Sequence, residues 1–504
     1  MLTNAALTDG ADARRWRALS VSLVAAFMVL LDVSIVNVAL PSIEREFGVS
    51  AGTIQWVVSG YALTFGLALV PAGRLGDTVG RRRMFLIALS AFVLTSALTG
   101  AAQNSAWLIG ARLLQGMAAG MLIPQNVGLI QDLFRGGERA RAFGVLGSIV
   151  GLSTATGPVV GGLILSVVGG ADAWRWIFYV NVPIGVVALV LAVRLVPATS
   201  TAGARGTHLD LMGSLLLGGG VLGLLLPVVA TESGSSSFLW LLVVPAVLLL
   251  AAFGWWEART ARRGRAPLLD PGLARTAGFP TGSAVALVYF TGFTGIWVVL
   301  ALFYQDGLGY SPLRSGLAVT PFALGSAASA VLAGRMVPRF GRWLTVSGLL
   351  AAAIGMVATA LILRRFGGDT AAWAAAGPLL VAGIGGGMVV SPNTTLTLES
   401  VPGRMAGAAG GALQTAQRIG SALGTALLAT VYYHALTSSR GGFGAAVSDA
   451  LLAAAGLMLL ALLIAVGELS RRRHHPLSSA SSVGTGTAAA PASPRTVSPE
   501  SVTS

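Results

Sequence analysis

Three ionisable side chains interrupt long apolar stretches of this 504-residue sequence, namely Asp32, Arg112 and Arg418. An ionisable group inside a membrane is costly and is usually functional or paired. At 1.5 Å per helical residue, Asp32 lies about 13 Å from Pro41 at the outer end of its stretch, and Arg112 lies roughly 9 Å from the outer end of its own. We therefore expect these two side chains at comparable depth in the outer half of a membrane.

A carboxylate that a neighbouring cation approaches and leaves can couple proton movement to another event. If the stretches that carry Asp32 and Arg112 face the same cavity, Asp32 can accept a proton or a cationic group. The alternative is a static ion pair that only fixes the packing. We expect Asp32 and Arg112 to be the proton-coupling residues.

Arg418 lies in the middle of another apolar stretch, one helical turn after Gln414, so that these two side chains share a helix face. Arg418 could be a substrate or gating contact, or a structural residue that hydrogen-bonds carbonyl groups of a neighbouring helix. Its available counter-ions are Asp32, a substrate or a helix C-terminus. We include it among the candidate substrate-binding residues.

The elements that must position these residues are apolar stretches long enough to cross a membrane. A membrane helix needs about 20 mostly apolar residues, and the sequence contains fourteen such stretches. They cover residues 17–40, 53–73, 84–102, 106–128, 142–168, 176–196, 210–230, 238–256, 279–305, 313–335, 343–363, 371–395, 404–433 and 447–467. The first is too long and too polar-ended for a signal peptide. The sequence predicts an all-α membrane protein with 14 transmembrane helices.

The basic residues give the orientation of these helices. Of the 33 basic residues, 25 fall on the side that carries both termini and 6 on the opposite side. Positive charge is enriched on cytoplasmic loops, so both termini are expected in the cytoplasm of a cell with a plasma membrane. The net charge of +14 is thus explained by topology, and no nucleic-acid partner is expected.

Composition excludes several classes of protein. The chain is 54% hydrophobic and 10% charged, whereas soluble domains are about 25% charged. A soluble enzyme, a disordered protein and a disulfide scaffold are therefore poor fits. The absence of Cys excludes thiol catalysis, disulfides and Cys-ligated metals. We expect no enzyme activity, no catalytic residue, no metal site and no cofactor.

An internal repeat organises the helices. Residues 73–81 and 334–342 share two Gly and two Arg at a constant offset of 261. The alternative is a chance similarity between two short turns, but the same offset also relates the ends of the apolar stretches. Two parallel repeats are typical of secondary transporters. The expected organisation is a cytoplasmic N-terminus (1–16), a six-helix bundle (17–196), a linker with two inserted helices (197–275), a second six-helix bundle (276–468) and a disordered cytoplasmic tail (469–504).

The fifth stretch contains Gly151, Gly157, Pro158, Gly161 and Gly162. Small residues let helices approach closely, and Pro permits a bend where neighbouring helices satisfy the freed carbonyl. We expect Gly157 and Pro158 to form a hinge or a seal between the two halves. The alternative is ordinary tight packing.

Several polar and aromatic side chains could line a central cavity. Candidates for substrate binding are Asn37, Gln55, Gln115, Asn126, Tyr289, Trp297, Tyr304, Asn393, Gln414 and Arg418. A wide cavity with aromatic faces and one carboxylate suits an amphipathic, often cationic, organic molecule.

Five segments resemble motifs of one known family, the fourteen-helix drug:proton antiporters of the major facilitator superfamily. The resemblance covers about residues 15–470. The segments are Leu31–Pro41, Gly73–Arg83, Arg112 with Gln115 and Gly116, Gly157–Gly162, and Trp174–Pro183.

The resemblance implies roles for particular residues. Asp32 is then linked to proton or substrate coupling and Arg112 to proton transfer. Asp77 is the key acid of a cytoplasmic gate, in a signature loop that also contains Gly73, Gly80 and Arg81. The Gly157–Pro158 motif is associated with antiporters rather than importers. Two departures are that Pro338 replaces the acid in the second signature loop, and that an extra carboxylate known in some relatives is missing.

From these observations we expect a monomeric, proton-coupled antiporter in the lipid bilayer of the plasma membrane. It would export amphipathic drugs or other small organic molecules by alternating access, using the proton gradient as its energy source. An alternative substrate is an endogenous metabolite, such as a self-made antibiotic, a siderophore or a lipid precursor. A proton-coupled importer and a non-transporting membrane sensor are the remaining alternatives.

Overall fold

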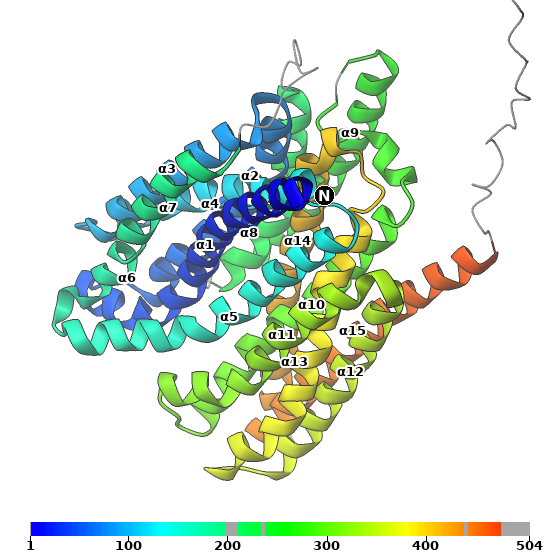
Figure 1. Cartoon of the computed structure of the whole chain (residues 1–504). Coiled ribbons are helices and arrows are strands. Elements are labelled where there is room, and N and C mark those ends of the chain that lie inside the picture. The colour runs from blue at the N-terminus through cyan, green and yellow to red at the C-terminus, as the bar shows by residue number, and fades with distance from the viewer. Residues whose placement is uncertain (1, 198–209, 233–236, 266, 438–441, 475–504) are drawn as a thin grey trace, which may run out of the picture.

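The computed structural model describes residues 2–197, 210–232, 237–265, 267–437 and 442–474, and these residues are helical or in short connections. Long helices form two bundles (Figure 1). The helices of the first half are α1 (Leu2–Phe47), α2 (Ala51–Val79), α3 (Arg81–Gly100), α4 (Ser105–Leu133), α5 (Gly136–Val168), α6 (Arg175–Tyr179) and α7 (Asn181–Leu195). Between the halves come α8 (Leu211–Glu232) and α9 (Val243–Arg262). The second half contains α10 (Phe279–Leu302), α11 (Pro312–Phe340), α12 (Arg342–Arg365), α13 (Thr370–Thr397), α14 (Ala406–Thr437) and α15 (Phe443–His474).

The helices begin and end where local chemistry favours it. The Ser50 side chain caps α2 by accepting a hydrogen bond from the Thr53 amide, and Asn104 caps α4 through the Trp107 amide. Such caps satisfy amides that have no partner inside the helix. Gly80 separates α2 from α3 with a φ of 104°, a conformation that other residues rarely adopt.

The membrane-spanning character predicted from the sequence is found along most of the described chain. Twelve of the described helices are long and apolar enough to cross a membrane, and two shorter apolar helices, Val159–Val168 and Leu211–Pro227, lie within α5 and α8. These two lie in the expected stretches 142–168 and 210–230.

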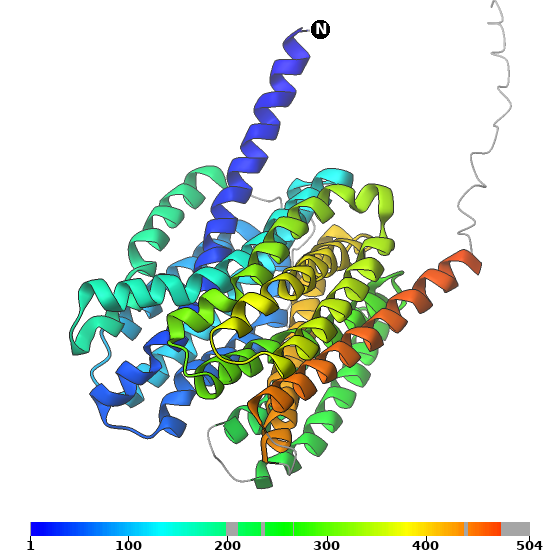
Figure 2. The same ribbon diagram turned by 90° about the horizontal axis from the view of Figure 1, so that it is seen from below.

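Some expected boundaries differ. The first helix runs from Leu2 to Phe47 rather than over 17–40, because the helix continues through Pro41. Figure 2 shows the first turns of α1 projecting beyond the bundle. The expected tail from 469 is helical as far as His474, and its later residues lie outside the described part of the chain. The sixth stretch, 176–196, is divided into α6 and α7, and a short 3₁₀ turn (Ala171–Trp174) precedes it.

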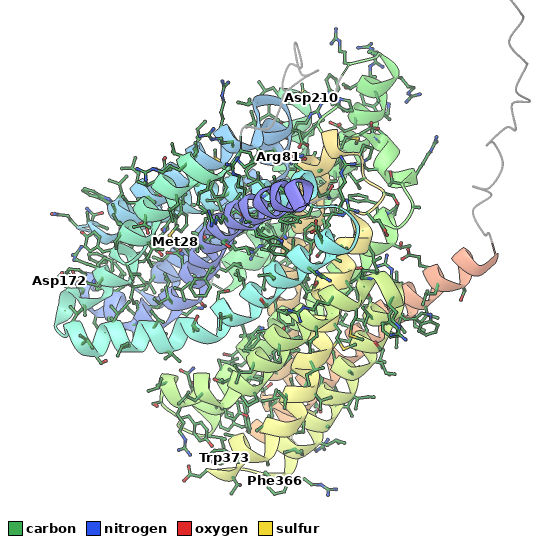
Figure 3. All side chains as sticks on the ribbon, in the orientation of Figure 1. Met28, Arg81, Asp172, Asp210, Phe366 and Trp373 are labelled. Carbon is green, nitrogen blue, oxygen red and sulfur yellow. The ribbon has the colours of Figure 1, made fainter. Side chains whose placement is uncertain are left out.

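The two halves contact each other chiefly through two pairs of helices, and α13 against α5 and α4 against α14 add smaller contacts. α2 packs against α14, and α5 packs against α11. A hydrophobic cluster spans the junction and includes Val127 of α4 and Leu413 of α14. From the junction, near Arg81, the two halves diverge toward the ends that carry Asp172 and Trp373 (Figure 3). The inserted helices α8 and α9 pack on each other, and α8 lies against α2 and α14.

Candidate functional site

A buried ion pair joins α1 to α4 inside the first half. Arg112 Nη1 lies 2.5 Å from Asp32 Oδ2, and the two side chains are 1% and 0% exposed. Arg112 also donates through Nε to the Val57 carbonyl at 3.0 Å and through Nη1 to Gln115 Oε1 at 2.9 Å. The depth comparison made from the sequence therefore placed Asp32 and Arg112 correctly relative to each other.

The second oxygen of Asp32 accepts two further hydrogen bonds. Gln115 Nε2 donates to Asp32 Oδ1 at 3.1 Å, and Asn181 Nδ2 donates to the same atom at 3.0 Å. Both amides also donate to Ser96 Oγ, whose own proton goes to the Phe178 carbonyl. Each of these partners of Asp32 is thus a donor, which is the environment of an ionised carboxylate.

Two aromatic rings lie close to the guanidinium of Arg112. Arg112 Cζ lies 4.1 Å from the centre of the Tyr61 ring and 5.6 Å from that of Phe178. A cation over an aromatic face is attracted by the ring quadrupole, more strongly where water is excluded. Helices of the first half therefore hold this charge pair away from solvent. They are α1, α2, α3, α4, α6 and α7.

Sequence reasoning found part of this site. Gln115 was expected to contact substrate, whereas the structure places it in the Asp32 network. The sequence indicated Asn181 only as part of the Trp174–Pro183 motif, and it did not predict a role for Ser96. A lone Ser or Asn in an apolar helix gives little signal, because such residues often bond their own helix backbone.

A second cluster of charges lies at the junction of the halves. The carboxylate of Asp77 accepts hydrogen bonds from the amides of Gly407 and Ala408 at the start of α14, at 3.0 and 2.9 Å. Arg81 pairs with Asp77 at 3.0 Å and with Asp132 at 2.6 Å. Asp77 therefore connects the first half directly to the second.

Arg81 strengthens this connection. Its Nη2 also donates to the Gly403 carbonyl at 2.9 Å, on the connection that precedes α14. Anionic groups are favoured at helix N-termini, where amides lack partners within the helix. Asp77 and Arg81 thus form a clamp that joins α2 and α3 to the start of α14 by both charge and hydrogen bonds.

Glycines let the helices at this junction touch. A Cβ on Gly73 would lie 2.3 Å from the Gly407 carbonyl oxygen, and one on Gly334 would lie 2.7 Å from Gly144 Cα. Both distances are far below van der Waals contact, so only Gly fits there. Gly73 was expected to take part in gating, and it lies in the α2–α14 contact.

Gly157 does not lie between the two halves, where a hinge or a seal was expected. A Cβ on Gly157 would meet Ser34 Oγ of α1 at 2.0 Å, so Gly157 packs inside its own half. Between the halves the contact is made by Gly144 and Gly151, which lie against α11. The difference follows from helix geometry, because six residues separate Gly151 from Gly157 and place them on different faces. The side chain of Pro158 lies outside the described residues.

The second half has its own buried charge pair. Arg342, at the position equivalent to Arg81, pairs with Glu468 at 2.6 Å and donates to Asn393 Oδ1 at 2.7 Å. Asn393 in turn donates to the Gly282 carbonyl. Asn393 was expected to contact substrate, but these bonds hold α10, α12 and α13 together.

The other expected substrate residues are scattered. Tyr289 and Tyr304 are buried in the core of the second half, and Asn126 is buried at 0% exposure. Asn37 is exposed, and the Gln55 side chain lies outside the described residues. Trp297, Gln414 and Arg418 are half-buried. The structure therefore leaves Gln414 and Arg418, one turn apart on α14, as a polar pair near the junction.

Two bundles of helices long and apolar enough to cross a membrane, joined at one end, are the architecture of a membrane transporter. The model of the Major Facilitator Superfamily matches residues 22–425, and the chain belongs to that superfamily. It is therefore a multi-pass membrane transporter.

Curated relatives are named as a transporter, a resistance protein and an export protein. The chain is 37% identical to the "Probable actinorhodin transporter" of Streptomyces coelicolor, over 84% of this chain and 74% of the relative. It is 39% identical to "Puromycin resistance protein pur8" of Streptomyces alboniger, over 84% and 83%. The "Tetracenomycin C resistance and export protein" of Streptomyces glaucescens is 31% identical, over 83% and 76%.

Solved structures share the fold. The human organic anion transporter MFSD10 aligns with a TM-score of 0.67 at 16% identity, over 90% of this chain and 99% of its own. The proton:xylose symporter XylE aligns with a TM-score of 0.65 at 16% identity, over 90% and 96%. At this identity the likeness concerns the fold alone.

Proposed function

We propose that this protein is a proton-coupled antiporter that exports small organic molecules across the plasma membrane. The observation that carries the proposal is the Asp32–Arg112 pair, which is fully buried and lies at 2.5 Å within apolar helices. A relative named as a resistance and export protein supports the direction of transport. Proton gradients, rather than a bound cofactor, supply the energy.

Protonation of Asp32 would change this site in a defined way. Its three side-chain partners among the described residues, Arg112, Gln115 and Asn181, are all donors. A proton on the carboxylate would face a donor and displace at least one partner, and it would remove the charge that holds Arg112. The proton thus competes with Arg112 for Asp32, which is the coupling step that we propose.

We propose fourteen transmembrane helices in two six-helix repeats, with α8 and α9 inserted and both termini cytoplasmic. The clamp of Asp77 and Arg81 then closes the cytoplasmic side, while the halves diverge toward the outer side (Figure 3). The described conformation is therefore outward-facing. Alternating access would require the clamp and the Gly73–Gly407 contact to open while the outer ends close.

The transport test uses inverted membrane vesicles, whose lumen corresponds to the outside of the cell. An acidic lumen should drive accumulation of a substrate such as actinorhodin, and a protonophore should stop it. Control vesicles lack the protein. Accumulation that depends on ATP and persists without a proton gradient would refute proton coupling. Accumulation driven only by an alkaline lumen would favour an importer.

The substrate could equally be an endogenous metabolite, because two relatives are named for antibiotics that microorganisms make. We also propose that the protein works as a monomer, since the Asp32 network and the clamp are completed within one chain. No nucleic-acid partner is proposed.

A further inference from the structure

Arg418 differs from the other deeply placed arginines. It projects from α14 toward α2, with its Cζ 4.2 Å from the centre of the Phe65 ring. It is half-buried, and it lies close enough to Tyr61 for electrostatic interaction. Among the described residues, no side chain or carbonyl hydrogen-bonds to Arg418 and no carboxylate pairs with it.

A purely structural role does not account for this arrangement. A structural guanidinium in a membrane interior is held by carbonyl oxygens or carboxylates, as Arg112 is by the Val57 carbonyl and Asp32. A charge without such partners is costly in an apolar surrounding. Arg418 has no such partner among the described residues, but it keeps accessible surface. Its partner is therefore a group that binds and is released.

The carboxylates near the junction are already engaged. Asp32 is 0% exposed and surrounded by donors, so it is not available to a cationic substrate. Asp77 and Asp132 both pair with Arg81. The charge left for a ligand in this part of the described chain is therefore positive, which favours an anionic substrate over the cationic one expected from the sequence.

We propose that Arg418 binds an anionic group of the transported molecule, so that the substrate is a small organic anion such as a carboxylate or an acidic phenol. The inference rests on the proposed export function and adds the charge of its substrate. Gln414, one turn away on the same helix and half-buried, supplies an amide beside the guanidinium. Arg forms directional, charge-assisted hydrogen bonds to carboxylates, which suits this role.

The position of Arg418 also relates the substrate to the proton site. Arg418 lies over Phe65, the Phe65 and Tyr61 rings are 6.1 Å apart, and Arg112 lies over Tyr61 at 4.1 Å. Two guanidinium groups therefore flank two aromatic rings on consecutive turns of α2. An anion that draws Arg418 away from Phe65 acts on the same helix face that supports Arg112.

The test compares binding of two dyes to the purified full-length protein in detergent, by fluorescence anisotropy. Fluorescein methyl ester and rhodamine 123 share a xanthene skeleton and a methyl ester, but the first is an anion and the second a cation. Hydrogen bonds to charged groups predict about 10- to 100-fold tighter binding of the anion. Arg418→Gln should weaken anion binding by the same factor and leave cation binding unchanged, and Arg418→Lys should keep a preference for the anion.

The matched control is Arg259→Gln, which removes an exposed guanidinium 5.2 Å from the Trp255 ring on α9 and should leave both affinities unchanged. Gel filtration and tryptophan fluorescence establish that each variant is folded. The proposal is overturned if the wild type binds the cation as tightly as the anion, if it does not bind the anion, or if folded Arg418→Gln keeps the preference. Should Arg418→Gln fail to fold, the wild-type ratio and the lysine variant decide. Absence of proton-driven accumulation in vesicles would refute the exporter instead, whatever the binding preference.

Discussion

Replacing Asp32 with Asn tests the proton site most directly. The amide keeps the shape of the carboxylate but introduces a donor beside the donors of Arg112, Gln115 and Asn181. It also leaves Arg112 buried without its counter-ion. Breaking a buried ion pair by removing one partner costs about 3–5 kcal/mol. We expect the lower part of this range, because Arg112 keeps the Val57 carbonyl and the Tyr61 ring.

A second variant separates stability from coupling. In Asp32→Asn with Arg112→Gln, the buried charge is gone, and much of the lost stability should return. Proton-driven accumulation should remain absent in both variants, because neither retains a carboxylate that can take up a proton at this position. Tryptophan fluorescence during heating measures stability, and accumulation in inverted vesicles with an acidic lumen measures coupling.

Two results would refute this reasoning. Undiminished proton-driven export by Asp32→Asn would show that the coupling proton binds elsewhere. An equal loss of stability in the single and double variants would show that the uncompensated charge of Arg112 is not the cause. Both measurements require that the variants reach the membrane in wild-type amount.

Three further predictions concern the junction and the second half. Asp77→Asn should weaken the clamp on the α14 amides, which lie 2.9–3.0 Å from the carboxylate. It should increase labelling of a Cys introduced at Ala408, which is 2% exposed in the clamped state, and the natural chain has no Cys to give background labelling. Gly73→Val should abolish export but not folding, because its side chain would overlap the Gly407 carbonyl, and a folded variant with full activity would contradict the gate. Glu468→Gln should lower stability by about 3–5 kcal/mol by isolating buried Arg342, while the number of protons exchanged per substrate stays unchanged in vesicle assays.

The sequence predicted those features that depend on one helix at a time. The apolar stretches and the depths of Asp32 and Arg112 follow from rise per residue and length, and the two residues do meet at 2.5 Å. The sequence could not show which neighbours complete the pair, because Ser96 and Asn181 come from other helices whose rotation depends on packing. The role of Gly157 was misplaced for the same reason, since the rotation of α5 turns it toward Ser34.

The substrate charge that we propose differs from the one expected from the sequence, because the sequence does not show the partners of Asp32 on other helices. Counting Asp32 as an available negative charge is reasonable from a sequence with one embedded carboxylate. In the structure, Gln115 and Asn181 donate to its second oxygen and Arg112 to its first, so the carboxylate is already engaged by donors. Among the described residues Arg418 has no hydrogen-bond or carboxylate partner, and only the three-dimensional arrangement could show this.

The location of the two arginines constrains how transport and proton movement can be coupled. The Asp32 network lies entirely within the first half, so a rigid rocking of one half against the other leaves its bonds intact. If Asp32 takes up the coupling proton as proposed, its protonation must act through a contact that crosses between the halves. Arg418 of α14 over Phe65 of α2 is such a contact, and Phe65 is followed by Tyr61 and Arg112. In this proposal, an anionic substrate that binds Arg418 does so at the interface between the two halves. It therefore acts directly on α2, the helix that supports the proposed proton site.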